Sequence, residues 1–230
     1  MLSNYITEVQ DLLNDSQGQM IPLPAMTRYI NRSRRRIAFV SGSIRVLPPG
    51  TQTGTNQEEY PFSAWTALVQ GTIPGVQSIL ACRSLAVAIG AGGWKPVWRR
   101  VPFTDFQARF RIYNRTFYGV ISEPGWWSQY GLGPNSKIYL APIPSQPMPM
   151  DVDLTCIPSP LLNDDDPEPI PYPWQDAVSY WAAVMALLGL QRREDAQAMA
   201  QLFNTDLPMC AAVVCPQMIV NPYGATLRAG

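Results

Sequence analysis

Apolar positions repeat every three to four residues at both ends of the chain, which is the spacing of an amphipathic helix. Near the start they include Tyr5, Val9 and Leu13, and this pattern predicts a helix over residues 4–14. A second helical pattern covers residues 25–40, and Pro24 suits its first turn because no amide hydrogen is needed there. Because a short loop joins them, the two helices are expected to pack as an antiparallel pair.

Two more helical patterns occupy the last third of the chain. Residues 174–190 are apolar on most sides, and residues 192–205 place Ala196 and Phe203 on one face. The pairs from the two ends are expected to share one core as a four-helix bundle. Residues 208–230 are apolar, have no helical period and contain spaced prolines, so they are expected to form an extended arm that lies on another surface.

The middle of the chain has a different texture. Between residues 41 and 157, glycine, proline, serine and threonine separate short aromatic or β-branched runs, a pattern typical of short strands and long loops. A short helix is predicted over residues 104–113. Strands are predicted at 44–47, 60–62, 76–87, 97–101, 117–121, 137–141 and 151–157, and the last two are expected to form a hairpin with a wide loop.

These patterns predict an α+β fold that is mainly an α-helical bundle. Two N-terminal and two C-terminal helices form the bundle, a β-rich segment is inserted between them, and an arm follows. The predicted segments are 1–40 for the first helix pair, 41–157 for the insertion, 158–207 for a joint and the second pair, and 208–230 for the arm.

The composition argues for an ordered protein with surfaces that become buried in an assembly. Of 230 residues, 47% are hydrophobic and only 15% are charged, which is the reverse of the balance that disorder requires. The net charge is zero, but residues 1–130 hold 13 basic and 7 acidic residues (+6), whereas residues 131–230 hold 4 and 10 (−6). Opposite charge on the two halves is compatible with head-to-tail packing of copies.

Candidate chemistry is sparse. The chain has no histidine, so it lacks the usual general base and the commonest metal ligand. Its four cysteines lack CxxC spacing, and neither a GxSxG motif nor a phosphate-binding glycine loop occurs. We therefore expect no enzymatic activity and no cofactor. The sequence starts without a secretion signal, and its longest apolar helical run is too short to cross a bilayer.

The second helix carries a strongly basic stretch, RYINRSRRRIA. Its arginines suggest three uses: sequence-specific DNA binding, lining of a lumen that carries DNA, or pairing with acids, either of a neighbouring subunit or at the edge of the core. The exclusive use of arginine favours bidentate pairing with protein carboxylates over a diffuse phosphate field. The residues of this basic face are Arg28, Arg32, Arg34, Arg35 and Arg36.

A run of prolines and acids precedes the third long helix. Asp164, Asp165 and Asp166 with Glu168 suggest a hard-cation site, but ligands at successive positions cannot all point at one ion, so a solvated turn is the preferred interpretation. Six prolines between 158 and 173 restrict the backbone, which predicts a rigid joint instead of a flexible linker. The joint residues are Pro160, Leu161, Asp164, Asp165, Ile170, Pro171 and Trp174.

Taken in order, these segments resemble the head-to-tail adaptor proteins of tailed bacteriophages, also called head-completion or neck proteins. The resemblance covers roughly residues 1–40 and 137–207. It is carried by RYINRSRRRIA at 28–38, IYLAPIP at 138–144, PLLNDD at 160–165, IP at 170–171, WQDA at 174–177, and REDA at 193–196 followed by Phe203.

This resemblance implies a structural virion protein, made in the bacterial cytoplasm, that forms a ring, usually of twelve copies. Such a ring docks beneath the portal protein, meets a tail, nozzle or stopper protein below, and surrounds the channel through which double-stranded DNA passes without sequence-specific contact. No membrane contact is expected. The arm is then expected to contact the portal or an adjacent subunit through Met209, Val213, Val214, Met218, Ile219, Val220, Tyr223 and Leu227.

Overall fold

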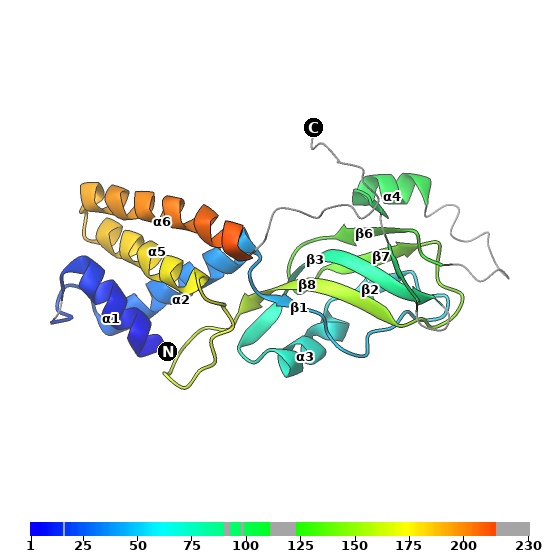
Figure 1. The fold of residues 1–230 in the computed structure, drawn as a ribbon, viewed down its shortest axis with the longest axis horizontal. Helices are drawn as coiled ribbons and strands as arrows, with labels where there is room; N and C mark the ends of the chain where they lie inside the picture. The colour runs from blue at the N-terminus through cyan, green and yellow to red at the C-terminus, as the bar shows by residue number, and fades with distance from the viewer. Residues whose placement is uncertain (16, 90–92, 98, 111–122, 215–230) are drawn as a thin grey trace. The chain divides into compact units, whose positions relative to one another are not determined.

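The computed structural model describes all residues except 16, 90–92, 98, 111–122 and 215–230 (Figure 1). The helices of the described part are α1 (Leu2–Leu13), α2 (Leu23–Ser41), α3 (Ser63–Thr72), α4 (Phe103–Arg109), α5 (Trp174–Gly189) and α6 (Arg193–Val214). Its strands are β1 (Arg45–Val46), β2 (Glu59–Pro61), β3 (Val76–Ile89), β4 (Gly93–Pro96), β5 (Arg99–Arg100), β6 (Trp126–Tyr130), β7 (Lys137–Ala141) and β8 (Met150–Pro158).

The chain folds into two compact units. The β unit contains residues 1–2 and 34–171, and the helical unit contains residues 3–33 and 172–230. Helix α2 contributes to both, with its residues up to Ser33 in the helical unit and those from Arg34 in the β unit. The division therefore falls inside a helix, at a point different from the segment boundaries that the sequence suggests.

Two four-stranded sheets form the β unit. The first has the order β1-β8-β3-β4 and the second β2-β7-β6-β5. All pairings in the first sheet are antiparallel, and in the second only the pair of β5 and β6 is parallel. Helix α3 lies against β3, and α4 lies against β6 on another side of the same unit (Figure 1).

The long pair of β3 and β8 is the centre of the first sheet. Its core side chains alternate along each strand and are fully buried, as Ile79, Val87, Val152 and Leu154 illustrate. Three irregularities interrupt the register along the pair, and such bulges bend and twist a strand. One of these irregularities lies between Cys82 and Ser84, where Arg83 and Ser84 are exposed.

Aromatic side chains dominate the core under the second sheet. Phe106 of α4 is fully buried against Tyr139 of β7, with ring centroids 6.1 Å apart. Phe103 lies 4.9 Å from the same tyrosine ring, and Phe110 stacks on Trp126 at 4.9 Å. Phe103, Phe106, Phe110 and Trp126 therefore pack together in one core cluster, as their size favours.

The helical unit is built on the antiparallel pair α5 and α6, joined by a short turn. The rings of Trp181 and Phe203 pack across this pair with centroids 5.0 Å apart. The Ser33 hydroxyl of α2 donates a hydrogen bond of 2.7 Å to the carbonyl oxygen of Val178. Gly189 ends α5 beside Tyr29, where an added Cβ would lie 3.0 Å from the phenolic oxygen.

All four helices predicted near the chain ends are present, as α1, α2, α5 and α6. The predicted fold class is nevertheless wrong, because the protein is a β-rich α+β fold and not mainly an α-helical bundle. The error comes from residues 41–157, which were interpreted as an insertion. They hold the eight described strands, together with α3 and α4, and bury an extensive core of their own.

Two predictions about strands differ from the structure. The predicted strands at 137–141 and 151–157 exist as β7 and β8, but they do not form a hairpin, because β7 pairs with β2 and β6 whereas β8 pairs with β1 and β3. The proline-rich connection between them lacks several amide donors and cannot continue a ladder. Strands β4 and β6 were not predicted, and the strand predicted at 117–121 lies outside the described residues.

The prediction that the last helix ends at residue 205 and that an extended arm starts at residue 208 is also wrong for residues 206–214, since α6 continues through Pro208 to Val214. A proline inside a helix costs roughly 3 kcal/mol, because it lacks a donor and clashes with the carbonyl four residues earlier. Here both Pro208 and Asn204 are exposed, so water can satisfy the released carbonyl. Beyond the proline, Cys210 is buried with its Sγ 3.7 Å from the Pro173 carbonyl oxygen.

Candidate functional site

The predicted joint is held in the β unit by a buried ion pair. Arg34 donates from Nε and Nη2 to the two carboxylate oxygens of Glu168, at 2.8 and 2.9 Å, and from Nη1 to the carbonyl oxygen of Ser159 at 2.7 Å. The side chains are only 1% and 4% exposed. Glu168 also accepts the amide hydrogen of Ile170 at 3.0 Å. This fork geometry satisfies both charges, which a buried pair requires.

Other contacts hold the same segment. Leu161 and Ile170 are buried, at 0% and 1% exposure. The amide of Ser159 donates to the carbonyl oxygen of Gly75 at 2.7 Å. Gly75 has φ +84, and an added Cβ would lie 2.5 Å from the backbone oxygen of Pro167, so only glycine fits there.

The three aspartates of the joint have three different environments. Asp166 accepts the amide hydrogens of Leu162 and Asn163 at 2.6 and 2.7 Å, and these bonds lower the pKa of its carboxyl group. Asp164 lies 3.5 Å from the N-terminal amine, and its side chain is 59% exposed. Asp165 is exposed, and the structure gives it no hydrogen bond or ion pair within the described part of the chain. We call residues 162–168 the acidic loop.

The predicted basic face of α2 is divided by the structure. Arg34 is buried in its pair with Glu168, so it cannot contact DNA or another subunit. Arg28, Arg32, Arg35 and Arg36 are exposed. Helical periodicity explains the difference, because Arg34 lies one turn after buried Ile30 and next to buried Ser33.

Of the remaining predicted joint residues, Pro160 and Pro171 are exposed, whereas Trp174 is buried in the helical unit at 1% exposure. Of the predicted arm residues, Met209, Val213 and Val214 belong to α6. The others lie outside the described residues, namely Met218, Ile219, Val220, Tyr223 and Leu227.

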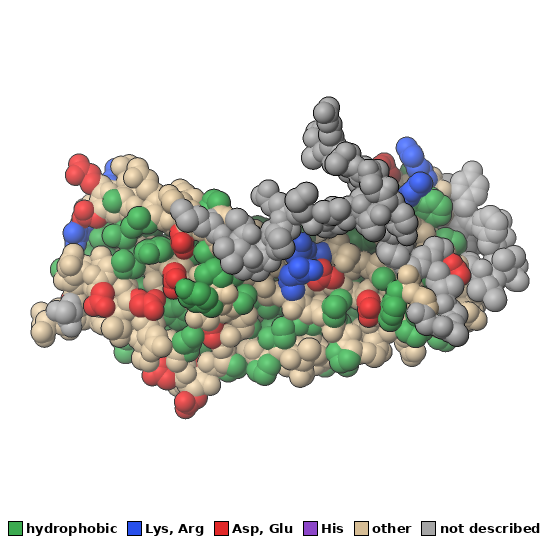
Figure 2. Space-filling model, viewed as in Figure 1, with side chains coloured by type: hydrophobic (Ala, Val, Ile, Leu, Met, Phe, Trp, Pro, Cys, Tyr) green, Lys and Arg blue, Asp and Glu red, His purple; other side chains and the backbone are tan. Residues whose placement is uncertain are grey.

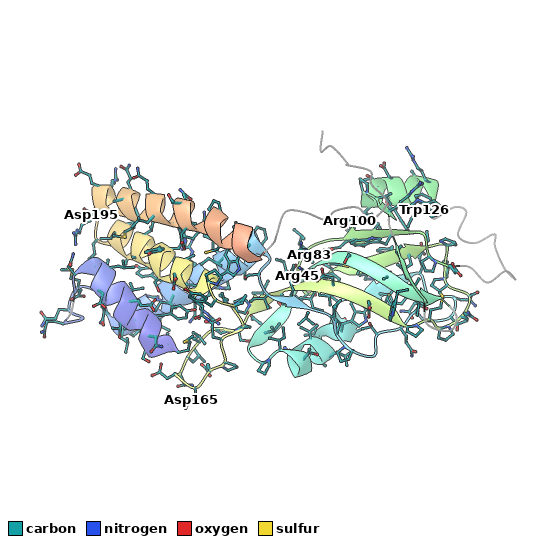
Figure 3. All side chains as sticks on the ribbon, in the orientation of Figure 1. Arg45, Arg83, Arg100, Trp126, Asp165 and Asp195 are labelled. Carbon is teal, nitrogen blue, oxygen red and sulfur yellow. The ribbon has the colours of Figure 1, made fainter. Side chains whose placement is uncertain are left out.

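A basic surface that the sequence did not suggest lies on the β unit (Figures 2 and 3). It consists of Arg45 on β1, Arg83 on β3 and Arg100 on β5, and we call it the arginine surface. All three are exposed. Figure 2 shows basic side chains gathered beside an acidic one on this face. The acidic residue that pairs with this surface is Asp153 of β8, whose carboxylate accepts hydrogen bonds from Arg45 Nη2 at 2.5 Å and from Arg45 Nε at 3.3 Å.

Tryptophans hold the adjacent arginines of β5 in place. The guanidinium carbon of Arg100 lies 5.2 Å from the centroid of the Trp127 ring, and that of Arg99 lies 5.9 Å from the Trp126 ring. The parallel pairing of β5 with β6 puts each arginine opposite its tryptophan. A guanidinium stacked on an aromatic face keeps its in-plane N–H donors available to a ligand.

The arginine surface is close to a buried thiol. Burial raises the pKa of the Cys82 thiol far above its ordinary value, the Asp153 carboxylate raises it further, and Arg100 opposes the shift. Cys156 on β8 is fully buried, and burial raises its pKa to about 12. Both thiols are therefore protonated and inert at neutral pH. The three described cysteines are free, which agrees with the absence of CxxC spacing.

The described residues contain no group of three or more histidine, cysteine, aspartate or glutamate residues arranged to hold a metal ion. In the helical unit, Asp176 has a raised pKa, first because it is partly buried and then because Glu8 and Asp206 are near.

None of the described helices combines the length and the apolarity that are needed to cross a membrane.

The sequence offered little signal for the arginine surface, because its three residues lie on different strands and far apart in the chain. Arg45 stands between buried Ile44 and Val46, so strand alternation alone predicts that its side chain points away from them. Nothing local indicates that Arg83 and Arg100 join it. Arg45 and Arg83 lie in the first sheet, on β1 and β3, whereas Arg100 lies on β5 of the second sheet. The two sheets meet near Cys82, whose amide donates to Gln129 of β6 at 3.0 Å and whose thiol is influenced by Arg100.

The fold and these surfaces define a two-unit α+β protein whose recognisable chemistry is arginine–carboxylate pairing. Comparison with known proteins adds no family: no family model matches the sequence, and neither does any curated protein.

Proposed function

We propose that this protein is a structural virion component, a head-to-tail adaptor that forms a ring beneath the portal and surrounds the DNA exit channel. The observation that carries the proposal is the contact of Arg34 with Glu168 and Ser159. Arg34 lies within the stretch RYINRSRRRIA at 28–38. Ser159 directly precedes the PLLNDD motif at 160–165, and Glu168 lies between that motif and the IP motif at 170–171. Two stretches that lie about 130 residues apart are therefore parts of one packed structure.

The exposed surfaces are consistent with this proposal. Large apolar side chains are exposed to solvent on α2, where Phe39 and Val40 are 61% and 55% accessible. Leu132 and Trp94 of the β unit are 66% and 49% accessible. Exposed apolar groups of this size are commonly covered by partner proteins. A subunit of a ring has such partners on two sides.

The test is the native mass of the full chain, alone and after coexpression with the portal protein encoded by the same genome. We expect a closed ring of one stoichiometry that stays bound to the portal through gel filtration. A chain that remains monomeric and does not bind the portal contradicts the proposal.

A second candidate function is nucleic-acid binding by α2, which the exposure of Arg28, Arg32, Arg35 and Arg36 favours. Binding of a DNA duplex should then weaken steeply with salt, because each neutralised phosphate releases counterions. Measuring the DNA affinity at 50 and 200 mM salt, with Arg35→Gln and Arg36→Gln together as the variant, separates this function from the first. Affinity that does not depend on these arginines or on salt excludes it.

A further inference from the structure

The arginine surface carries positive charge that the described residues do not neutralise. Arg45, Arg83 and Arg100 supply three positive charges and Asp153 one negative charge, which leaves two positive charges. Asp153 is held by Arg45, and neither Arg83 nor Arg100 has a hydrogen bond or an ion pair with another described residue. Among the described residues, the donors of these two arginines are therefore unused.

The acidic loop of the same unit has the opposite character. Asp164 and Asp165 are exposed, while Asp166 is occupied by the backbone of the loop and fixes its shape. Buried Leu161 and Ile170 anchor the two ends of the loop. In Figure 3, Asp165 lies at the tip of a loop that points away from the labelled arginines. Among the described residues, no ion pair joins the loop to the arginine surface.

We infer that the arginine surface of one copy of this chain binds the acidic loop of a neighbouring copy. The inference rests on the proposed ring, and it names the contact that closes it. In a ring, every copy must carry two different surfaces that fit each other. The β unit has two exposed arginines, Arg83 and Arg100, and a carboxylate loop whose shape Asp166 fixes. Arginine matches carboxylate through two parallel hydrogen bonds.

A partner made of phosphates fits this surface less well. The positive side chains lie on three different strands and do not form a row that could follow a phosphate backbone. The surface also has a chemically matching loop on the chain itself. Charge complementarity therefore favours a second copy over nucleic acid.

Charge reversal tests the inference in the full-length protein. One variant carries Arg83→Glu and Arg100→Glu, and a second carries Asp164→Lys and Asp165→Lys. Like charges placed opposite each other at an interface cost several kcal/mol, so each variant should self-associate at least about tenfold more weakly than the wild type in sedimentation velocity. A matched control, Arg193→Glu, changes an exposed arginine of α6 outside both surfaces and outside the basic face of α2, and should leave self-association unchanged.

Mixing the two reversed variants makes the test specific. The arginine surface of the second variant meets the unchanged loop of the first, and the glutamates of the first meet the lysines of the second. The equimolar mixture, and a chain that carries all four changes, should therefore regain self-association to within a few-fold of the wild type. General unfolding or loss of solubility cannot produce this recovery. Circular dichroism and thermal melting of each variant check that it is folded, and Arg83→Glu alone replaces the first variant if the loss of the Arg100 stack disturbs it.

Several outcomes overturn the inference. They are a wild-type chain that stays monomeric at 10 mM salt and high concentration, a loop variant that associates like the wild type, and a mixture that does not recover. Loss of DNA affinity in the Arg83 and Arg100 variant with unchanged self-association assigns the surface to nucleic acid instead. If rings still form on the portal in every variant, the inference fails and the adaptor function stands. If charge-dependent self-association occurs without portal binding, the adaptor function fails alone.

Discussion

Replacing Arg34 by methionine should raise the population of the opened β unit far more than replacing any exposed arginine of α2. The change leaves the Glu168 carboxylate buried at 4% exposure and removes its two guanidinium bonds, at 2.8 and 2.9 Å. It also removes the donor to Ser159 at 2.7 Å. Breaking a buried pair from one side costs about 3–5 kcal/mol. At about 1.4 kcal/mol per decade, the open state becomes roughly 140- to 3,700-fold more populated.

The buried thiols of the β unit report this opening directly. Cys82 and Cys156 are at most 1% exposed, so an alkylating reagent reaches them only when the unit opens. Peptide mapping by mass spectrometry reads their labelling rates separately from the other cysteines. Under conditions in which closing is faster than labelling, the rate ratio of variant to wild type gives the change in the free energy of opening.

The neighbouring residue supplies the matched control. Arg35→Met removes an exposed guanidinium from the same helix and should change labelling by less than about twofold, because surface substitutions usually stay within 0.5 kcal/mol. A double variant, Arg34→Met with Glu168→Leu, should recover most of the loss, since it leaves no unpaired buried charge. The reasoning is refuted if Arg34→Met accelerates labelling less than about fivefold, or if the double variant is worse than the single one.

Three further predictions concern the joint and the strands beneath it. Asp166→Asn should destabilise the loop at neutral pH but not in strong acid, as urea titrations at pH 7 and pH 2.5 measure. The pKa of the Asp166 carboxyl group in the folded state is lowered below 3.8. The carboxylate therefore contributes its full stabilisation above pH 3.8, and this stabilisation disappears as the pH falls through the folded-state pKa. Gly75→Ala should cost about 1–3 kcal/mol in thermal melting because of the positive φ, whereas Gly71→Ala in α3, where nothing lies within 4 Å, should be neutral or stabilising by up to about 1 kcal/mol. Burial raises the pKa of the Cys156 thiol from 9.0 to about 12. The stabilisation from the buried neutral thiol is therefore complete below pH 9 and is lost between pH 9 and 12. A Cys156→Ala variant should lack this part of the decrease in stability at alkaline pH.

The long helices were predictable from the sequence because their apolar faces repeat locally. Tyr5, Val9 and Leu13 are buried on one face of α1, as their spacing indicates. Strand positions were also largely predictable, since period-two alternation is a local signal as well. Strand partners were not, because pairing joins residues such as Arg45 and Thr155 that lie far apart in the chain. For this reason β7 and β8 were expected to form a hairpin, although they lie in different sheets.

The candidate sites show the same limit in their chemistry. Three consecutive aspartates are the most conspicuous feature of the joint sequence, but the acid that anchors the joint is Glu168, through its buried pair with Arg34. Burial decides which acid forms this pair, and burial cannot be read from the acidic run itself. Arg34 and Arg35 are adjacent and chemically identical, yet one neutralises a buried carboxylate and the other is exposed. A helix turns by about 100° per residue, so neighbours differ in environment even where their side chains are the same. It follows that a substitution at Arg34 tests the fold, and that only substitutions at exposed residues such as Arg35 or Arg83 test binding.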